Sequence, residues 1–260
     1  MAAHRHRERE REMESKIEAA TGKLVVKKVG GKSTVTRCFS KYPLKFIIPN
    51  KVGSSETDAV WVYTLTYGGG IVSGDSISCE ITVADACTAV LTTQASTKVY
   101  KSLGSKSSEQ ILEAKIGSDA LLAVIPDPVT CFSTARYSQK QIFRVVLDSS
   151  LVIVDWITSG RHESGEKWDF ELYRSTNHIF LEGDQPLFLD SCCVIGVAGT
   201  REHYQHCRTY AGLPSYCDGH TLGGIGIVVR IAAMTTESVY RFLQHQLTGM
   251  ETLLGVSPYS

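Results

Sequence analysis

The chain holds carboxylates in positions where they could meet a metal ion. Asp75 follows a glycine-rich turn, Asp127 lies between two prolines, and Asp155 lies inside the apolar run LVIVDWI. Glu163 and Glu166 follow in SGRHESGE. Oxygen ligands hold borderline divalent cations less tightly than imidazole or thiolate clusters do. We therefore expect these five side chains to touch a hydrated cation in turn without trapping it.

Asp155 is the most informative of these charges, because a carboxylate in an apolar strand needs a partner or a water-filled space. We expect residues 151–157 to form one strand, with Asp155 in its middle. Three interpretations stay open. Asp155 forms a buried ion pair with Arg161 or Arg136, or alternation points it to solvent, or it lines a polar tunnel. For Asp127, the flanking prolines predict a stiff elbow, and the alternative is a plain turn aspartate.

Residues 67–75, YGGGIVSGD, hold glycines that allow positive φ or the close approach of another backbone. These are Gly68, Gly69, Gly70 and Gly74. A dinucleotide-binding loop does not fit, because Ser73 replaces the third glycine and a strand follows. A phosphate loop at Gly30-Gly31-Lys32-Ser33 does not fit either, since Val26 stands where its first glycine is required.

The run LTTQASTK combines neutral donors and acceptors with a single ammonium group. Its polar members are Thr92, Thr93, Gln94, Ser96, Thr97 and Lys98. One interpretation is a strand irregularity whose hydroxyls satisfy the local backbone. The other is the lining of a polar passage or of a partner surface.

The spacing of the candidate residues matches no known motif for an enzyme active site or for a permanently bound metal. His162-Glu163 lacks the second histidine of a zinc protease motif, and Ser164 is not in Gly-x-Ser-x-Gly. His203 and His206 would share a helix face only if residues 200–210 were helical. With Cys207, Cys217, Asp218 and His220 they form no recognised metal spacing.

Four motifs in order, YGGGIVSGD, LTTQASTKVYKS, IPDPVTCF and DWITSGRHESGEKW, resemble the urease accessory protein UreD (UreH) family over residues 42–173. The resemblance implies a non-catalytic, mainly β scaffold that joins UreF and UreG on apo-urease. It also implies nickel in transit through an internal passage, with no tightly bound cofactor, and a shared Ser-Gly-Arg that includes Arg161. The alternative is a β-rich interaction module with no role in metal transit.

The elements that position these residues are predominantly strands. Alternation places Ile77, Cys79, Ile81 and Val83 on one face, and turn signals separate runs of strand length. Alternation likewise predicts a buried face made of Trp61, Tyr63, Leu65 and Tyr67. We expect a charged, disordered arm over residues 1–20 and a single β domain over residues 21–260, β-helix-like or built of stacked sheets. A strand over residues 221–233 and about two helices, the first capped by Thr235, end the chain.

Composition narrows the partners and the compartment. Lys plus Arg equals Asp plus Glu at 27 each, so no global field favours nucleic acid or an acidic membrane. No apolar run has the length of a membrane span. The 8 cysteines lack Cys-x-x-Cys spacing and follow no apolar signal segment, which predicts a soluble protein of the reducing cytoplasm.

Overall fold

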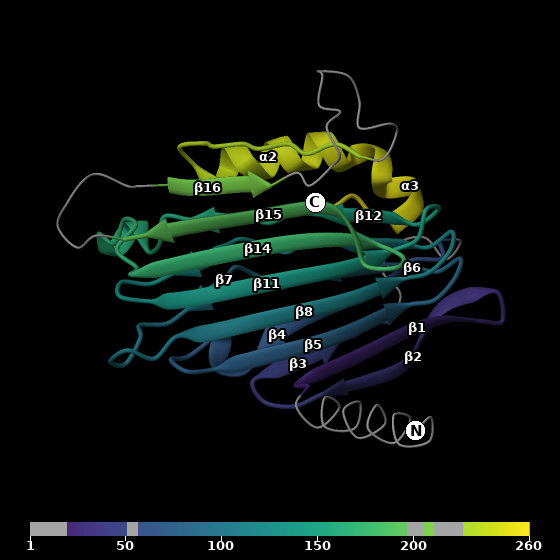
Figure 1. Cartoon of the computed structure of the whole chain (residues 1–260), viewed down its shortest axis with the longest axis horizontal. Coiled ribbons are helices and arrows are strands. Elements are labelled where there is room, and N and C mark those ends of the chain that lie inside the picture. Colours follow the sequence, from purple (N-terminus) through teal and green to yellow (C-terminus); the bar gives the residue numbers. More distant parts are fainter. Residues whose placement is uncertain (1–19, 51–56, 197–204, 211–225, 260) are drawn as a thin grey trace.

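The computed structural model describes residues 20–50, 57–196, 205–210 and 226–259, and the strands of these residues form three sheets (Figure 1). The 8-stranded sheet has the order β16-β15-β14-β11-β8-β5-β1-β2, the 5-stranded sheet β12-β9-β6-β4-β3, and the 3-stranded sheet β13-β10-β7. The strands of the 8-stranded sheet are β1 Gly22–Val29, β2 Lys32–Ser40, β5 Ser76–Val83, β8 Ser108–Ile116, β11 Arg136–Val145, β14 Leu172–Leu181, β15 Gln185–Ile195 and β16 Gln205–Tyr210. The strands of the 5-stranded sheet are β3 Leu44–Ile47, β4 Val60–Thr66, β6 Thr88–Thr92, β9 Leu121–Val124 and β12 Ser150–Ile153. The strands of the 3-stranded sheet are β7 Thr97–Val99, β10 Val129–Cys131 and β13 Ile157–Thr158.

The chain winds through these sheets as a β-solenoid. Each rung runs from the 5-stranded sheet through the 3-stranded sheet to the 8-stranded sheet: β6-β7-β8, then β9-β10-β11, then β12-β13-β14. The first rung runs from β4 through the bridge of Ile71 with Val99 to β5. Neighbouring rungs pair in parallel, with Val60, Ala89, Leu122 and Leu151 in one row. The expected β-helix-like architecture is confirmed, and its parallel pairs are joined through sheet corners instead of helices.

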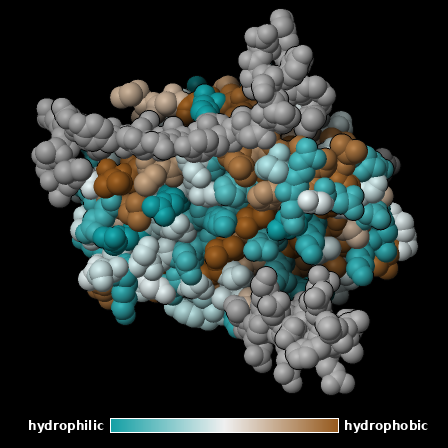
Figure 2. Space-filling model, in the orientation of Figure 1, coloured by the Kyte–Doolittle hydropathy of each residue, from teal (hydrophilic) through white to brown (hydrophobic). Residues whose placement is uncertain are grey.

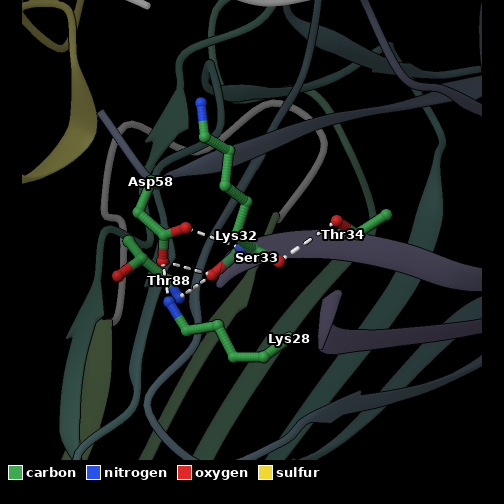
Figure 3. A network of polar contacts seen from close by, with 6 residues as sticks. All are labelled: Lys28, Lys32, Ser33, Thr34, Asp58 and Thr88. Atoms are coloured by element: carbon green, nitrogen blue, oxygen red, sulfur yellow. Dashed lines mark hydrogen bonds and ion pairs between the residues drawn. The ribbon is translucent and has the colours of Figure 1, made fainter. Parts of the chain in front are cut away.

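Antiparallel strands close the two ends of the 8-stranded sheet, β1 with β2 at one end and β14-β15-β16 at the other. The turn of the β1–β2 hairpin is tied to the first rung through Asp58 (Figure 3). The amide and the hydroxyl of Ser33 each donate to the Asp58 carboxylate at 2.6 Å, and Lys28 forms an ion pair with it. Burial opposes ionisation of Asp58, but hydrogen bonds from Lys28 and Ser33 outweigh it and lower its pKa.

The core lies inside the solenoid, and the predicted inward face of β5 is confirmed. Ile77, Cys79, Ile81 and Val83 are all at most 5% exposed. The outer face of the 8-stranded sheet is turned toward the viewer in Figures 1 and 2, and hydrophilic and hydrophobic side chains mix across it. Alternation therefore reports correctly on strands that have one face in the core and one toward solvent.

Only Trp61 of the predicted buried face of β4 is buried, whereas Tyr63 and Leu65 are half-buried. Val62, expected on the opposite face, is fully buried in the interior, while Tyr67 is half exposed and lies in the 3-10 turn η1 (Tyr67–Gly69). Trp61 is buried on the other side of the strand, against Leu254. Both faces of the 5-stranded sheet are covered, so alternation between apolar and polar residues cannot identify the inner one.

Helical segments provide that outer cover. They are α2 (Thr236–Leu247), the 3-10 turn η3 (Thr248–Met250) and α3 (Glu251–Leu254). Thr235 caps α2 as predicted, its hydroxyl accepting from the amide of Ser238 at 3.3 Å. The Trp61 indole donates to the carbonyl of Leu254 at 2.8 Å, which anchors α3 on the sheet. Among the described residues, no helix combines the length and apolar character that crossing a bilayer requires.

Two predicted strands are corrected. Residues 226–233 form no strand, and Ile227 and Val229 are largely exposed, while residues 221–225 lie outside the described part. The run 151–157 is not one strand either: β12 ends at Ile153 and β13 begins at Ile157. The chain turns a corner between two sheets there, so Asp155 lies at a bend and not within a strand.

Candidate functional site

The sequence motifs come together because they are equivalent corners of consecutive rungs. Each corner leaves the 5-stranded sheet, and the four comprise residues 67–70, 93–96, 125–128 and 154–156. Because β4, β6, β9 and β12 pair side by side, the segments that follow them stack in the same order. We call this arrangement the corner column. The glycine turn, the hydroxyl-rich run, the proline elbow and the Asp155 bend are thus neighbours in space.

A cavity of about 270 Å³ lies against the corner column and reaches between the sheets. Nine of the residues that the sequence singled out for a polar passage or a metal role line it: Gly69, Thr92, Thr93, Gln94, Ser96, Thr97, Lys98, Asp127 and Asp155. Strand residues from the interior complete the lining, among them Gln110, Tyr137, Gln139 and Gln141. The cavity is therefore polar along the corners and on part of the sheet that faces them.

Asp155 reaches into this interior and is held there by neutral groups. Its Oδ1 accepts from Gln139 Nε2 at 2.6 Å and from the Tyr173 hydroxyl at 3.4 Å. Its Oδ2 accepts from Asn177 Nδ2 at 2.7 Å and from the Ser175 hydroxyl. Neutral donors fix the carboxylate and satisfy its lone pairs while leaving its charge uncancelled.

The ion pairs considered for Asp155 are made by other residues. Arg136 Nη1 lies 2.8 Å from Glu171, and Arg161 pairs with Glu166. Of the three interpretations of Asp155, the ion pair with Arg136 or Arg161 is wrong. The carboxylate lines the polar cavity instead.

Sequence reasoning missed the donors to Asp155. Gln139, Ser175 and Asn177 are each at most 8% exposed and occupy inward positions of β11 and β14. The sequence did contain a signal for these donors. They follow Tyr137 or Tyr173 at every second position, and so lie on the strand face that those two tyrosines indicate to be buried. Burial raises the pKa of the Tyr137 and Tyr173 phenols well above 10.0. The charges of Cys131 and Asp155 add to this effect at Tyr137, and the charge of Asp155 adds to it at Tyr173.

Asp127 belongs to the elbow of the third corner and is held from two sides. Its Oδ2 accepts from the Thr93 hydroxyl at 3.1 Å, and its amide donates to that same hydroxyl oxygen at 2.8 Å. Its Oδ1 accepts from the hydroxyl of Tyr240 in α2 at 2.8 Å. These hydrogen bonds fix Asp127 to the second corner and anchor the C-terminal helix on the elbow.

The hydroxyl-rich run satisfies neighbouring backbone at one position and lines the cavity at others. The Thr92 hydroxyl donates to the carbonyl of Ile125 at 3.0 Å, which satisfies backbone at the next corner. Gln94 and Lys98 are exposed and line the cavity beside Ser96. One end of the run thus stabilises the stack, and the other end leaves polar side chains at the cavity surface.

The glycines explain how closely the first corner approaches the second. A Cβ on Gly70 would lie 2.7 Å from the carbonyl oxygen of Lys98, so the predicted close approach is to the chain's own backbone. Gly68, Gly69 and Gly74 have positive φ, the conformation for which glycine is best suited. Only Gly69 of these four lines the cavity.

Three of the five candidate carboxylates lie away from the cavity lining. Asp75 accepts from the amide of Val72 at 2.9 Å in a turn. Glu163 is exposed in the 3-10 turn η2 (His162–Ser164). Glu166 accepts from the Ser133 amide at 3.1 Å and pairs with Arg161, whose guanidinium stacks 4.3 Å from the Phe132 ring centroid. That ion pair lowers the pKa of Glu166.

Two members of the candidate His/Cys cluster near the C-terminus lie in a strand. Residues 205–210, which include His206 and Cys207, form strand β16, so the helical condition for a shared face is wrong there. His203, Cys217, Asp218 and His220 lie outside the described residues. Within the part of the chain that is described, no three His, Cys, Asp or Glu side chains gather as a metal site.

Comparison with known proteins identifies the same family that the four sequence motifs resemble. Residues 18–257 match the family model described as UreD urease accessory protein. "Urease accessory protein D" of Arabidopsis thaliana is 52% identical, over 93% of this chain and 100% of that protein. "Urease accessory protein UreD" of Anaeromyxobacter sp. (strain Fw109-5) is 30% identical, over 95% of this chain and 91% of that protein. The chain belongs to the UreD family of urease accessory proteins.

Proposed function

We propose that this chain is a non-catalytic scaffold that joins UreF and UreG on apo-urease and conducts nickel through its polar cavity. Membership of the UreD family supports the accessory role. The observation that carries the nickel role is the Asp155 carboxylate, which lines the cavity and accepts hydrogen bonds from the neutral side chains of Gln139, Ser175 and Asn177. In a medium of low dielectric constant its charge attracts a cation over several ångströms.

The same lining favours passage over storage. Among the residues that the structure describes, Asp127 and Asp155 are the two carboxylates in the lining, and Cys79 is the one cysteine. Burial raises the pKa of Cys79 to about 12, so its sulfur stays a protonated thiol at neutral pH. A thiolate or an imidazole cluster would trap nickel, whereas isolated carboxylates release it. The cavity therefore suits an ion that is handed on.

Reconstitution of urease activation tests this proposal. Apo-urease, UreF, UreG, GTP, bicarbonate and nickel are mixed with the wild-type chain, with Asp155→Asn, with Asp127→Asn, or without the chain. Nickel content of urease is measured alongside complex assembly by size-exclusion chromatography. Glu113→Gln is the matched control, because Glu113 is exposed on the outer face of the 8-stranded sheet.

We expect the omission and Asp155→Asn to leave urease largely without nickel, and Asp155→Asn to leave the complex assembled. If Asp155→Asn and Asp127→Asn load nickel as well as the wild type while complexes form, the chain is an interaction module without metal transit. If urease is activated equally without the chain, the accessory proposal itself fails.

A further inference from the structure

Polar side chains continue beyond the cavity along one row of paired residues in the 8-stranded sheet. Gln141 of β11 pairs with Asn177 of β14, and Asn177 pairs with Asp190 of β15. Gln141 lines the cavity and donates to Asn177 Oδ1 at 2.9 Å, and Asn177 donates in turn to Asp155. Residues that lie directly opposite each other on paired strands share a face of the sheet. Asp190 is therefore on the same inward face as the residues that hold Asp155.

Asp190 lies where the solenoid ends. The last rung is β12-β13-β14, and Asp155 is in its corner. Beyond that rung the 8-stranded sheet continues to β15, whereas the described 5-stranded sheet stops at β12 (Figure 1). The Asp190 side chain is 15% exposed, while Asn177 beside it is buried. Along this row, Asp190 is thus the carboxylate that reaches the surface.

A guanidinium covers Asp190 at this end. Arg230 Nη2 donates to Asp190 Oδ1 at 2.9 Å, and Nη1 donates to Oδ2 at 3.5 Å. Arg230 belongs to residues 226–233, which are exposed and form no strand. The same C-terminal part of the chain supplies the Tyr240 hydroxyl that binds Asp127. It therefore places a donor on one carboxylate of the cavity and on the one that lies beyond it.

A nickel ion and this guanidinium would compete for the same oxygens. Arginine keeps its charge at any pH at which the protein is folded, so Arg230 leaves Asp190 by displacement and not by losing a proton. At equal distance a dication attracts a carboxylate twice as strongly as a guanidinium does. The cavity lining includes Gln141 and Asp155 but neither Asn177 nor Asp190. The row beyond Asp155 is thus closed while the ion pair is formed.

We propose that Arg230 is a gate of the nickel passage and that Asp190 is the carboxylate it guards. Without nickel, the ion pair closes the row at the end of the solenoid. A nickel ion that moves past Asn177 displaces the guanidinium and binds Asp190 before it leaves this end. This inference rests on the proposed function, to which it adds a further metal-binding residue and a displaceable counter-ion.

A structural role of the same ion pair makes a different prediction. If the pair only fastens residues 226–233 to β15, the loss of either partner has the same effect. If the pair is a gate, the two losses have opposite effects, because Arg230→Gln frees the carboxylate and Asp190→Asn removes it.

The rate of nickel transfer to urease distinguishes these roles. The reconstituted activation mixture contains limiting nickel and the full-length chain as wild type, Arg230→Gln or Asp190→Asn. We expect Arg230→Gln to raise the rate by about two- to fivefold and Asp190→Asn to lower it by a similar factor. A reversed pair, Asp190→Arg with Arg230→Asp, restores the ion pair but places a cation in the row, so transfer should stay low. Arg144→Gln, which breaks the exposed Arg144–Asp184 pair, is the matched control.

Nickel binding gives a readout that does not depend on urease. Equilibrium dialysis against Ni²⁺ is performed on the full-length chain assembled with UreF. Arg230→Gln should bind nickel about two- to fivefold more tightly than the wild type, and adding Asp190→Asn to that variant should abolish the gain. Size-exclusion chromatography checks that each variant assembles. Should Asp190→Asn fail to assemble, Arg230→Gln alone decides, because a gate predicts a gain and a fastener predicts none.

Two results would overturn the gate. Equal losses of transfer in Arg230→Gln and Asp190→Asn, recovered in the reversed pair, would identify a purely structural contact. Transfer and nickel binding unchanged in both variants would remove Asp190 from the passage. If Asp155→Asn also loads nickel normally, the proposed function itself fails, and that result is separate because Asp155→Asn leaves the Asp190–Arg230 pair in place.

Discussion

The hydroxyl of Tyr240 donates to Asp127 Oδ1 at 2.8 Å, joining residues 113 positions apart in the sequence. Tyr240 also packs edge-on against Trp156, at 4.9 Å between ring centroids. Trp156 and Tyr259 both donate to the carbonyl of Pro126, at 3.0 and 2.8 Å. The C-terminal segment is thus fastened to two corners of the column, through residues that line the cavity.

Tyr240→Phe should loosen that fastening. The variant removes the hydrogen bond to Asp127 and keeps the ring against Trp156, so a loss of about 1–2 kcal/mol of stability is expected. Hydrogen exchange should accelerate in α2 while the solenoid strands remain protected. Tyr42→Phe, at an exposed ring, is the control. Unchanged exchange in α2 of Tyr240→Phe would show that the hydroxyl contributes nothing.

Alkaline pH should destabilise the fold through the buried phenols. Burial raises the pKa of Tyr137 and of Tyr173 above 10.0, so the folded state keeps them neutral while the unfolded chain ionises them. The stabilisation is therefore complete below pH 10.0 and is lost as pH rises above it. Thermal unfolding across this range should show the decline, and Tyr173→Phe should reduce its slope. An equal slope in the variant would contradict the assignment.

Asp155→Ala should be far more damaging than Asp155→Asn. Alanine leaves the side chains of Gln139, Ser175 and Asn177 buried without their acceptor, and each such loss costs about 1–3 kcal/mol. Asparagine keeps one acceptor oxygen and the side-chain volume. Urea unfolding measures both, with Glu113→Gln as the exposed control. Comparable losses for alanine and asparagine would mean that packing, not the donors, matters at this bend.

Gly70→Ala should destabilise the contact between the first two corners. Its methyl group would lie 2.7 Å from both the Lys98 carbonyl oxygen and a ring carbon of Tyr100. Relieving such overlap typically costs about 1–3 kcal/mol. Gly249→Ala, where a Cβ would meet nothing within 4 Å, is the control. Equal melting temperatures of the two variants would refute the close-packing argument.

Acid should release the turn that Glu166 holds. The hydrogen bond from Arg161 lowers the pKa of Glu166 despite partial burial, so its stabilising effect is present above the ordinary carboxyl pKa of 4.5 and is lost as pH falls below it. Glu166→Gln should remove this pH dependence. Fluorescence of Trp168 in the same turn reports it, and a dependence unchanged in the variant would assign it to another carboxyl group.

The sequence by itself determined what depends on neighbouring residues. Ile77, Cys79, Ile81 and Val83 alternate because β5 has one face in the core, and this was predictable from period-two spacing. The Thr235 cap was equally local. Where both faces are covered, as at Trp61 and Val62, both positions are apolar and the pattern loses its information.

Only the tertiary structure decided which distant residues form the site. Asp127 and Asp155 share a cavity with Lys98 because their corners stack, whereas Asp75, with a similar setting in the sequence, closes a turn outside it. Stacking depends on the register of parallel rungs, and no local spacing encodes that register. The residues that hold Asp155 come from two strands that follow separate corners, so their role emerges only when the solenoid closes.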